Sequence, residues 1–255
     1  MAGAPAAFDF VAPAHWRAID FISDLHLGAA LPRTFDACAA HLRTTPADAV
    51  FILGDLFELW VGDEMRERAF ERRCVDALAG AARRLTIGFM AGNRDFLVGA
   101  DLMCDSGMIR LPDPTRLDAW GRVVLLSHGD ALCLADRDYQ AFRRQVRDAA
   151  WQSAFLARPL AERLAVAAEV RSASAARQRF DGDAAADIDR DEAARWLAAA
   201  GASTLVHGHT HRPGSEPVGP GLQRHVLSDW DLDRGLRAEV LRLTRDGFER
   251  IAPAS

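Results

Sequence analysis

The chain has 255 residues, a formal net charge of −5 and 49% hydrophobic residues, which suffices for a full core in an ordinary globular domain. Its acidic balance, with a pI near 5.9, argues against the basic class of non-specific nucleic-acid binders, and we expect no nucleic-acid partner. We expect neither a signal peptide nor a membrane-spanning helix, because no run of about eighteen apolar residues occurs. Four widely spaced cysteines favour reduced thiols over a disulfide framework.

Strand and helix patterns alternate along most of the chain. Residues 1–16, rich in alanine and proline, are predicted to be a flexible N-terminus ahead of one domain at 17–255. Helical periodicity covers residues 64–84, and the alternation predicts an α/β fold with parallel strands. Five short apolar runs predict β-strands, at 18–23, 49–53, 85–90, 123–127 and 204–206. Three later runs are typical of β-hairpins, at 223–227, 236–243 and 247–251.

A long helical segment, about residues 136–180, breaks this alternation. It carries Tyr139, Phe142 and Trp151 among many arginines. It lies between the fourth and fifth of the five predicted strands, where a lid or substrate-binding insertion would have to be. We expect that role for it.

Each of the five predicted strands ends in a polar cluster that is competent to bind metal. Ligands of open α/β sheets bind beyond the carboxyl ends of the strands, so we expect the five clusters to converge on one site. Side chains two residues apart on an extended strand end share a face, which would aim both members of a D-x-H or H-x-H pair at that site. The candidate ligands are Asp24, His26, Asp55, Asn93, His128, His207 and His209.

The chemistry of these groups indicates a pair of divalent cations. Two carboxylates, four imidazoles and one amide, with no thiolate, suit manganese, iron or zinc. Seven ligands exceed one tetrahedral site but fit two ions about 3.5–4 Å apart, with Asp55 as the predicted bridge. Such a pair converts bound water to hydroxide near neutral pH and neutralises phosphoryl charge. The pattern therefore predicts phosphate ester or anhydride hydrolysis without a serine or cysteine nucleophile.

Residues beside the ligands have predicted supporting roles. Gly54 and Gly92 permit sharp turns and a close approach of the backbone to bound ligands. Arg94 is suited to gripping phosphate oxygens and to offsetting charge in the transition state.

Three further polar residues flank the same motifs. Asp95 and Asp130 are expected to orient Arg94 and His128 by hydrogen bonds. His211, the third histidine of its loop, is either a supporting residue or a direct ligand.

Together the motifs resemble the calcineurin-like metallophosphoesterase superfamily. They are D-x-H at 24–26, G-D at 54–55, G-N at 92–93, His128 and the histidine motif at 207–209. Over roughly residues 19–245 the chain also resembles the UDP-2,3-diacylglucosamine pyrophosphatases of the lipid A pathway. Arg94 stands where most of the superfamily has histidine, as it does in this lipid A family. The stretches that carry this second likeness are FISDLHLG (21–28), ILGDLFELWVGDE (52–64), GNRDFLVG (92–99), LSHGDALCLADRDYQAFR (126–143) and VHGHTHRP (206–213).

The resemblance implies a four-layer αββα metallophosphoesterase sandwich, with a helical lid between the fourth and fifth metal motifs. It implies two Mn²⁺ ions, or other divalent ions in their place. The first ion would be held by Asp24, His26, Asp55 and His209, and the second by Asp55, Asn93, His128 and His207. The implied catalytic residues are Asp55, Asn93, Arg94 and His128. The implied substrate contacts are Asn93, Arg94, Asp136, Ser174, Gln178 and His207.

The implied reaction is hydrolysis of UDP-2,3-diacylglucosamine, by attack of a metal-bound hydroxide on the α-phosphorus. Its products are UMP and 2,3-diacylglucosamine 1-phosphate. Because the substrate is acylated, the resemblance implies a cytoplasmic protein that acts peripherally at the cytoplasmic face of the inner membrane. We expect a monomer.

The insertion departs from the usual S-x-x-x-N-x-x-K pattern of the lipid A family. Ser174 is kept and Gln178 exchanges one amide for another, but Asp181 places an anion where the family has a cation. Either Arg177 or Arg179 takes that role, or the head group of the substrate differs.

Several alternatives stay open on the sequence alone. The chain is compatible with another dinuclear metallophosphoesterase, such as a nucleotide phosphodiesterase or a phosphatase, and with a non-catalytic scaffold. An intact ligand set argues against the scaffold. The arginines of the insertion either bind phosphate or lipid or form a solvated face, namely Arg143, Arg144 and Arg147. Its apolar residues either line an acyl-chain groove or pack internally, namely Trp151, Phe155 and Leu156.

Overall fold

The strands of the protein form two six-stranded sheets. The computed structural model describes residues 4–181 and 187–255, and of residues 171–181 it describes the backbone alone. The first sheet has the order β1 (Phe8–Val11), β6 (Thr115–Ala119), β7 (Arg122–Ser127), β8 (Thr204–His207), β10 (Leu222–Val226), β9 (Gly214–Gly219). The second has the order β12 (Gly247–Ile251), β11 (Val240–Thr244), β2 (Ala18–Ile22), β3 (Ala49–Leu53), β4 (Thr86–Met90), β5 (Ile109–Arg110).

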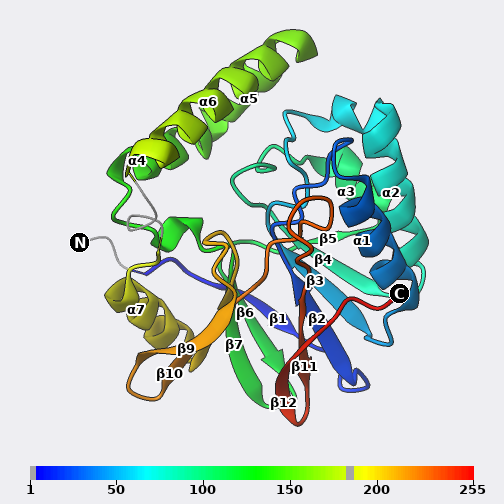
Figure 1. Cartoon of the computed structure of the whole chain (residues 1–255). Helices are drawn as coiled ribbons and strands as arrows, with labels where there is room; N and C mark the ends of the chain where they lie inside the picture. Colours follow the sequence, from blue (N-terminus) through cyan, green and yellow to red (C-terminus); the bar gives the residue numbers. More distant parts are fainter. Residues whose placement is uncertain (1–3, 182–186) are drawn as a thin grey trace.

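Helices cover the outer faces of the two sheets, which gives four layers (Figure 1). The second sheet is covered by α1 (Pro32–Thr44), α2 (Ala69–Ala82) and α3 (Ala100–Ser106). The first sheet is covered by α7 (Arg190–Ala200). Short 3₁₀ turns lie at η1 (Asp63–Glu67) and η2 (Asp130–Leu132). The expected αββα sandwich is confirmed.

Side chains of the inner strands alternate between two apolar clusters. In β3, Val50 and Ile52 join the cluster that contains the buried faces of α1 and α2, whereas Phe51 and Leu53 pack between the sheets. Every residue of β2 and β3 is buried. The points at which these strands end, and at which the polar motifs begin, are therefore fixed by packing on both faces.

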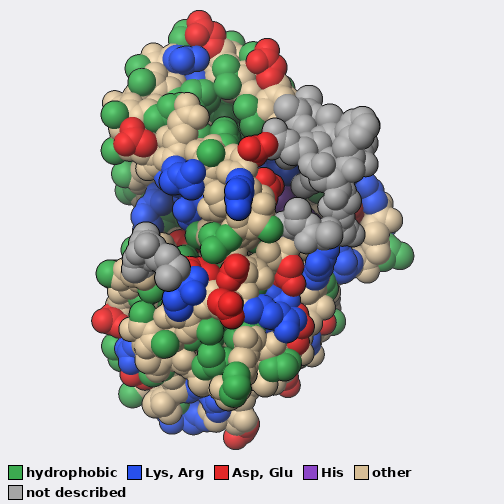
Figure 2. Space-filling view, turned by 90° about the vertical axis from the view of Figure 1, so that its left-hand side faces the viewer, with side chains coloured by type: hydrophobic (Ala, Val, Ile, Leu, Met, Phe, Trp, Pro, Cys, Tyr) green, Lys and Arg blue, Asp and Glu red, His purple; other side chains and the backbone are tan. Residues whose placement is uncertain are grey.

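The segment between β7 and β8 contains three helices that rise above the ends of the sheets (Figure 1). They are α4 (Arg137–Val146), α5 (Ala149–Leu156) and α6 (Leu160–Asp181), and we call them the insertion. Figure 2 views the molecule from the side of α4 and α7. Arginine side chains gather across the middle of this face, with hydrophobic side chains above and below them.

The sequence located β2, β3, β4, β7, β8, β10 and β12 to within about two residues, but other features differ. Residues 8–11 form β1, which pairs in parallel with β6, so the N-terminus is not flexible over that stretch. The helix expected at 64–84 is divided into η1 and α2, because Arg68 is extended with ψ at 147°. The strand expected at 236–243 begins at Val240. Both sheets are mixed, and the sequence pattern did not indicate β5, β6 or β9.

Candidate metal centre

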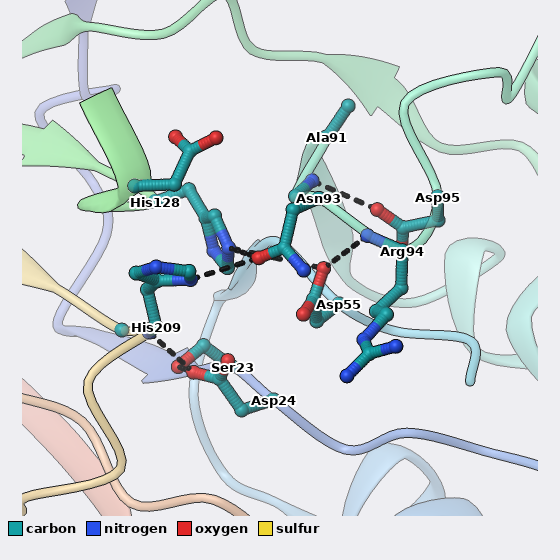
Figure 3. Close-up of polar contacts among 12 residues, drawn as sticks. Ser23, Asp24, Asp55, Ala91, Asn93, Arg94, Asp95, His128 and His209 are labelled. Carbon is teal, nitrogen blue, oxygen red and sulfur yellow. Dashed lines mark hydrogen bonds and ion pairs between the residues drawn. The ribbon is translucent and has the colours of Figure 1, made fainter. Parts of the chain in front are cut away.

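The polar motifs meet where strand ends of the two sheets face one another (Figure 3). Asn93, which follows β4 of the second sheet, lies beside two histidines that follow strands of the first sheet. Its Oδ1 atom is 3.0 Å from His128 Nε2 and 2.8 Å from His209 Nδ1. The site is therefore assembled across two sheets, and not along the single sheet edge that strand alternation indicated.

Two groups of candidate ligand atoms share Asp24. Atoms of Asp24, His26 and His211 lie within 4.8 Å of one another, and so do atoms of Asp24, Asp55 and His128. The Nε2 atoms of His26 and His211 are 3.3 Å apart. Asp24 Oδ1 lies 3.4 Å from His211 Nε2, is buried and has no hydrogen-bond partner. Converging imidazole nitrogens beside an unsatisfied carboxylate oxygen fit a divalent cation.

The histidine loop brings a further histidine to the site, because His211 lies beside Asp24 and His26. His207 is the last residue of β8, and its buried Nε2 has no hydrogen-bond partner. Its Nδ1 donates to the Gly208 carbonyl oxygen at 2.9 Å, and it belongs to neither ligand group of the described residues. Beyond that glycine the chain leaves the strand, and the next two histidines turn into the site.

Five side chains of the site stand on left-handed backbone. Such φ values are uncommon outside glycine, cost on the order of 1–3 kcal/mol each, and concentrate at functional sites. The D-x-H pair therefore does not stand on an extended strand end, as its spacing suggested, because both of its members have φ near 50°. The residues concerned are Asp24, His26, Asp55, His209 and His211.

Gly54 and Gly92 leave the room that the ligands need. A Cβ atom on Gly92 would lie 2.1 Å from Asp55 Oδ1, and one on Gly54 would lie 2.3 Å from His128 Nδ1. Gly54 also has a φ of +93°, which glycine adopts at little cost. Both glycines thus leave space for the side chains of Asp55 and His128.

Two imidazoles of the site have a carboxylate behind them. His26 Nδ1 lies 3.2 Å from Glu58 Oε2, and His211 Nδ1 lies 3.7 Å from Asp229 Oδ2. An acceptor at Nδ1 holds a proton there and leaves the Nε2 lone pair directed into the site, which is the usual environment of metal-binding histidines. The sequence patterns did not point to either carboxylate; an acid close to a metal motif was the one available signal for Glu58.

Asp130 anchors the insertion and does not orient His128. Its Oδ2 atom accepts hydrogen bonds from Tyr139 Oη at 2.7 Å and from Arg143 Nε at 2.8 Å. His128 is oriented by the Leu53 carbonyl, which accepts from His128 Nδ1 at 2.9 Å. The sequence expectation for Asp130 is corrected: its carboxylate ties the start of the insertion to the rim of the site.

Asp95 holds the backbone of the loops beneath Arg94. It accepts from the backbone N–H of Leu56 at 2.7 Å and of Gly92 at 2.8 Å. Asp55 Oδ1 in turn accepts from the backbone N–H of Arg94 at 2.8 Å. The guanidinium of Arg94 extends away from the carboxylates (Figure 3), and its buried Nε has no hydrogen-bond partner. An orphaned guanidinium donor beside a metal site suits an anionic ligand.

Charge in the site is strongly unbalanced toward the carboxylates. Burial opposes ionisation of Asp24, but His211, His128 and His26 hold its pKa well below the usual range. Burial also disfavours the charged form of His128, yet Asp55 and Asp24 raise its pKa to about 9. The Asp24 carboxylate therefore stays ionised at neutral pH, and its buried charge requires positive charge nearby. A divalent cation would supply that charge.

The insertion contacts the site and the core at several points. Arg147 Nη2 donates to the Gly92 carbonyl at 2.9 Å, and Asp136 caps α4 by accepting from the Tyr139 backbone N–H at 2.9 Å. Trp151 and Phe155 stack with centroids 4.8 Å apart and pack on the core, which supports the packing interpretation for these two. Leu156 is 39% exposed. Ser174 and Gln178 lie outside the residues whose side chains are described.

The chain is similar to known phosphoesterases over most of its length. A family model described as calcineurin-like phosphoesterase matches residues 18–213. The UDP-2,3-diacylglucosamine hydrolase of Xanthomonas oryzae pv. oryzae strain PXO99A is 43% identical over 239 residues, covering 89% of this chain and 95% of that protein. The protein of that name from Stenotrophomonas maltophilia strain K279a is 43% identical over 245 residues, with the same coverage. That of Xanthomonas campestris pv. campestris strain 8004 is 44% identical over 240 residues, covering 89% and 96%.

Substitution of two glycines tests the steric demand of the site. We expect Gly92→Ala to lower the free energy of unfolding by about 1–3 kcal/mol, because the new methyl group overlaps Asp55. Gly80→Ala is the control: Gly80 lies in α2, and a methyl group there would meet no atom within 4 Å, so a gain of up to about 1 kcal/mol is expected. Urea unfolding measures both. Equal stability of the two variants would contradict the tight fit at Gly92.

Proposed function

This chain belongs to the calcineurin-like phosphoesterase family, and we propose that it hydrolyses the pyrophosphate bond of UDP-2,3-diacylglucosamine. The proposal is supported by one combined observation of sequence similarity and site composition. Relatives named for that activity are 43% to 44% identical across 89% of this chain, and the chain gathers the carboxylate, imidazole and amide groups of a dinuclear hydrolase in one place. The products would be UMP and 2,3-diacylglucosamine 1-phosphate.

The metal centre in this proposal holds two divalent cations, for which Mn²⁺ is the expected ion. When bound, the pair lowers the pKa of water and neutralises charge that develops on phosphorus. Asp24 and Asp55, whose carboxylate oxygens lie within 4.8 Å of each other, would both be ligands of the pair. His26 and His211 would help to hold one ion, and Asn93, His128 and His209 would help to hold the other. His207, whose buried Nε2 has no hydrogen-bond partner, would remain a ligand of the second ion.

The chain's own residues would bind and orient the diphosphate. Arg94 offers a buried Nε–H without a partner, and its backbone is fixed on Asp55, so its guanidinium is preorganised to donate to phosphate oxygens. Burial lowers the pKa of His209 to about 4, which keeps its imidazole neutral and able to act as a ligand at pH 7. Asp136 lies at the start of α4, between the site and the insertion, which suits its implied contact with substrate.

The insertion is the lid of this proposal, and it would receive the acyl chains. Its exposed apolar residues include Leu156, at 39%, and Val170, at 41%. Arginine side chains gather across the middle of the face that Figure 2 shows. Apolar and basic groups together suit an acylated substrate presented at an anionic membrane surface. None of the described helices has the length and apolar character to cross a bilayer. The proposal is a peripheral enzyme at the cytoplasmic face of the inner membrane, acting as a monomer.

Turnover of the glycolipid against simpler esters tests the substrate. With Mn²⁺, we expect the enzyme to cleave UDP-2,3-diacylglucosamine with a kcat/KM well above those for bis-p-nitrophenyl phosphate and cyclic nucleotides. Asp55→Asn should lower kcat on every substrate by more than about 100-fold, beyond the range seen for residues that only support a ligand. The measurements are mass spectrometry of UMP, absorbance of released p-nitrophenolate, and chromatography of the nucleoside monophosphates. Cleavage of the simple esters without the glycolipid would refute the substrate assignment.

Calorimetric titration with Mn²⁺ tests the carboxylates behind the histidines. We expect Glu58→Gln and Asp229→Asn each to weaken the affinity for one of the two ions by about 10–100-fold, because the imidazole it supports loses its anionic acceptor. Asp246→Asn, at an exposed turn before β12, is the matched control and should leave both affinities unchanged. Wild-type affinities in both supporting variants would show that the two carboxylates do not orient these histidines.

A further inference from the structure

Arg163 of α6 is a buried arginine that binds the loop at residues 60–64. Its side chain is 2% exposed, although it belongs to a helix that rises away from the sheets. Nη1 donates to the Val61 carbonyl at 2.5 Å, Nε donates to the Arg158 carbonyl at 3.0 Å, and Nη2 pairs with the Glu64 carboxylate. The guanidinium therefore joins the insertion to the main domain through directional bonds, which apolar packing alone does not provide.

The loop at residues 60–64 is shaped around that guanidinium. Gly62 has a φ of +140°, and a Cβ atom placed on it would lie 2.0 Å from Arg163 Nη1. A side chain at this position would thus be strained in its backbone and would displace the arginine. The buried guanidinium of Arg163 and the glycine in the loop at residues 60–64 are therefore both required for this contact.

The same loop is bonded to the backbone of Arg94. The Trp60 backbone N–H donates to the Arg94 carbonyl at 3.0 Å, and Trp60 Nε1 donates to Asp63 Oδ1 at 3.0 Å. Asp63 also accepts from the Gly99 backbone N–H at 2.8 Å, at the start of α3. Hydrogen bonds at both ends of this loop, joined by the peptide bond between Trp60 and Val61, therefore connect α6 to Arg94.

The two ends of the insertion are held differently. Its first helix is tied by charged groups to Asp130 and the rim of the site. Beyond Asp148, α5 and the start of α6 rest on the core chiefly through apolar contacts, among them Trp151 against Phe96 with ring centroids 6.4 Å apart. Apolar contacts are non-directional and let packed helices slide. Arg163 supplies the directional contact that this second half otherwise lacks among the bonds described.

We propose that Arg163 is a positioning residue for substrate binding, a latch that fixes the height of α6 above Arg94. The inference rests on the proposed function, in which the insertion receives the acyl chains while Arg94 receives the diphosphate. With the latch closed, the insertion and Arg94 lie at a fixed separation, so one acylated substrate can contact the insertion with its acyl chains and Arg94 with its diphosphate. With the latch broken, the metal centre stays intact, but an acylated substrate loses preorganised contacts. A small ester, which needs no insertion, is indifferent to the latch.

Arg163→Met tests this directly, since it keeps the length and apolar stem of the side chain and removes the bonds. We expect KM for UDP-2,3-diacylglucosamine to rise about tenfold or more, a loss of about 1.4 kcal/mol of binding. kcat/KM for bis-p-nitrophenyl phosphate should stay within about twofold of wild type. Arg43→Met, at an exposed arginine of α1 outside the insertion, is the matched control and should leave both substrates unaffected. Arg163→Lys should restore part of the lost KM, because it keeps the charge but not the fork.

Gly62→Ala perturbs the latch from the other side and covers the case in which Arg163→Met does not fold. It should raise the KM for the glycolipid selectively, as Arg163→Met does, and hydrogen exchange should quicken in the first turns of α6 in both variants. An unchanged glycolipid KM in the folded variants would overturn the latch, and so would equal losses on both substrates, which indicate general damage. Wild-type enzyme that leaves the glycolipid intact would instead overturn the proposed function on which the latch depends.

Discussion

Two acidic side chains, Asp24 and Asp55, are buried side by side where the sheets meet, and the compensation of negative charge there is the constraint on which the rest of the site depends. Buried like charges are costly unless a counter-charge stands between them. Imidazoles from both sheets surround the carboxylates. Left-handed backbone brings these side chains close together, and glycines leave space for them. No single strand could deliver this, because the groups approach from opposite layers. The αββα architecture thus allows ligand side chains from both sheets to surround the candidate metal site.

The residues with strained backbone and the glycines that leave space for ligand side chains both lie at the candidate metal site. Left-handed backbone at non-glycine ligands and missing Cβ atoms at neighbouring glycines both oppose stability locally. These strained conformations persist because β2 and β3 are buried along their whole length. The packed core therefore fixes the loops that follow the strands in conformations that are unfavourable in isolation. The insertion adds a second layer of restraint through Asp130 and Arg163, which join it to opposite sides of the site.

Much of the fold could be predicted, because the inner strands are continuous apolar runs and each ends at a recognisable motif. The strand at Phe8–Val11 was hidden by its short length, its mostly exposed residues and the prolines around it. The sequence pattern could not show that the strands form two sheets. Alternation of apolar residues indicates which strand faces are buried, but it does not indicate which element packs against them. The sequence left the role of His211 open, because spacing along a loop does not show which side chains turn toward Asp24. Glu58 and Asp229 act through other side chains, and a sequence does not display such indirect contacts.

The cross-sheet construction has a consequence for how the protein reaches its native state. Site residues run from Asp24 to His211, so almost the whole chain must collapse before the last ligand arrives. Contacts between residues so distant in sequence form slowly, since the loop between them must first be closed. A centre built from these residues would be completed late in folding, and a fragment without one of the sheets would lack some of its ligands. Cation uptake would then mark the moment at which the two sheets dock.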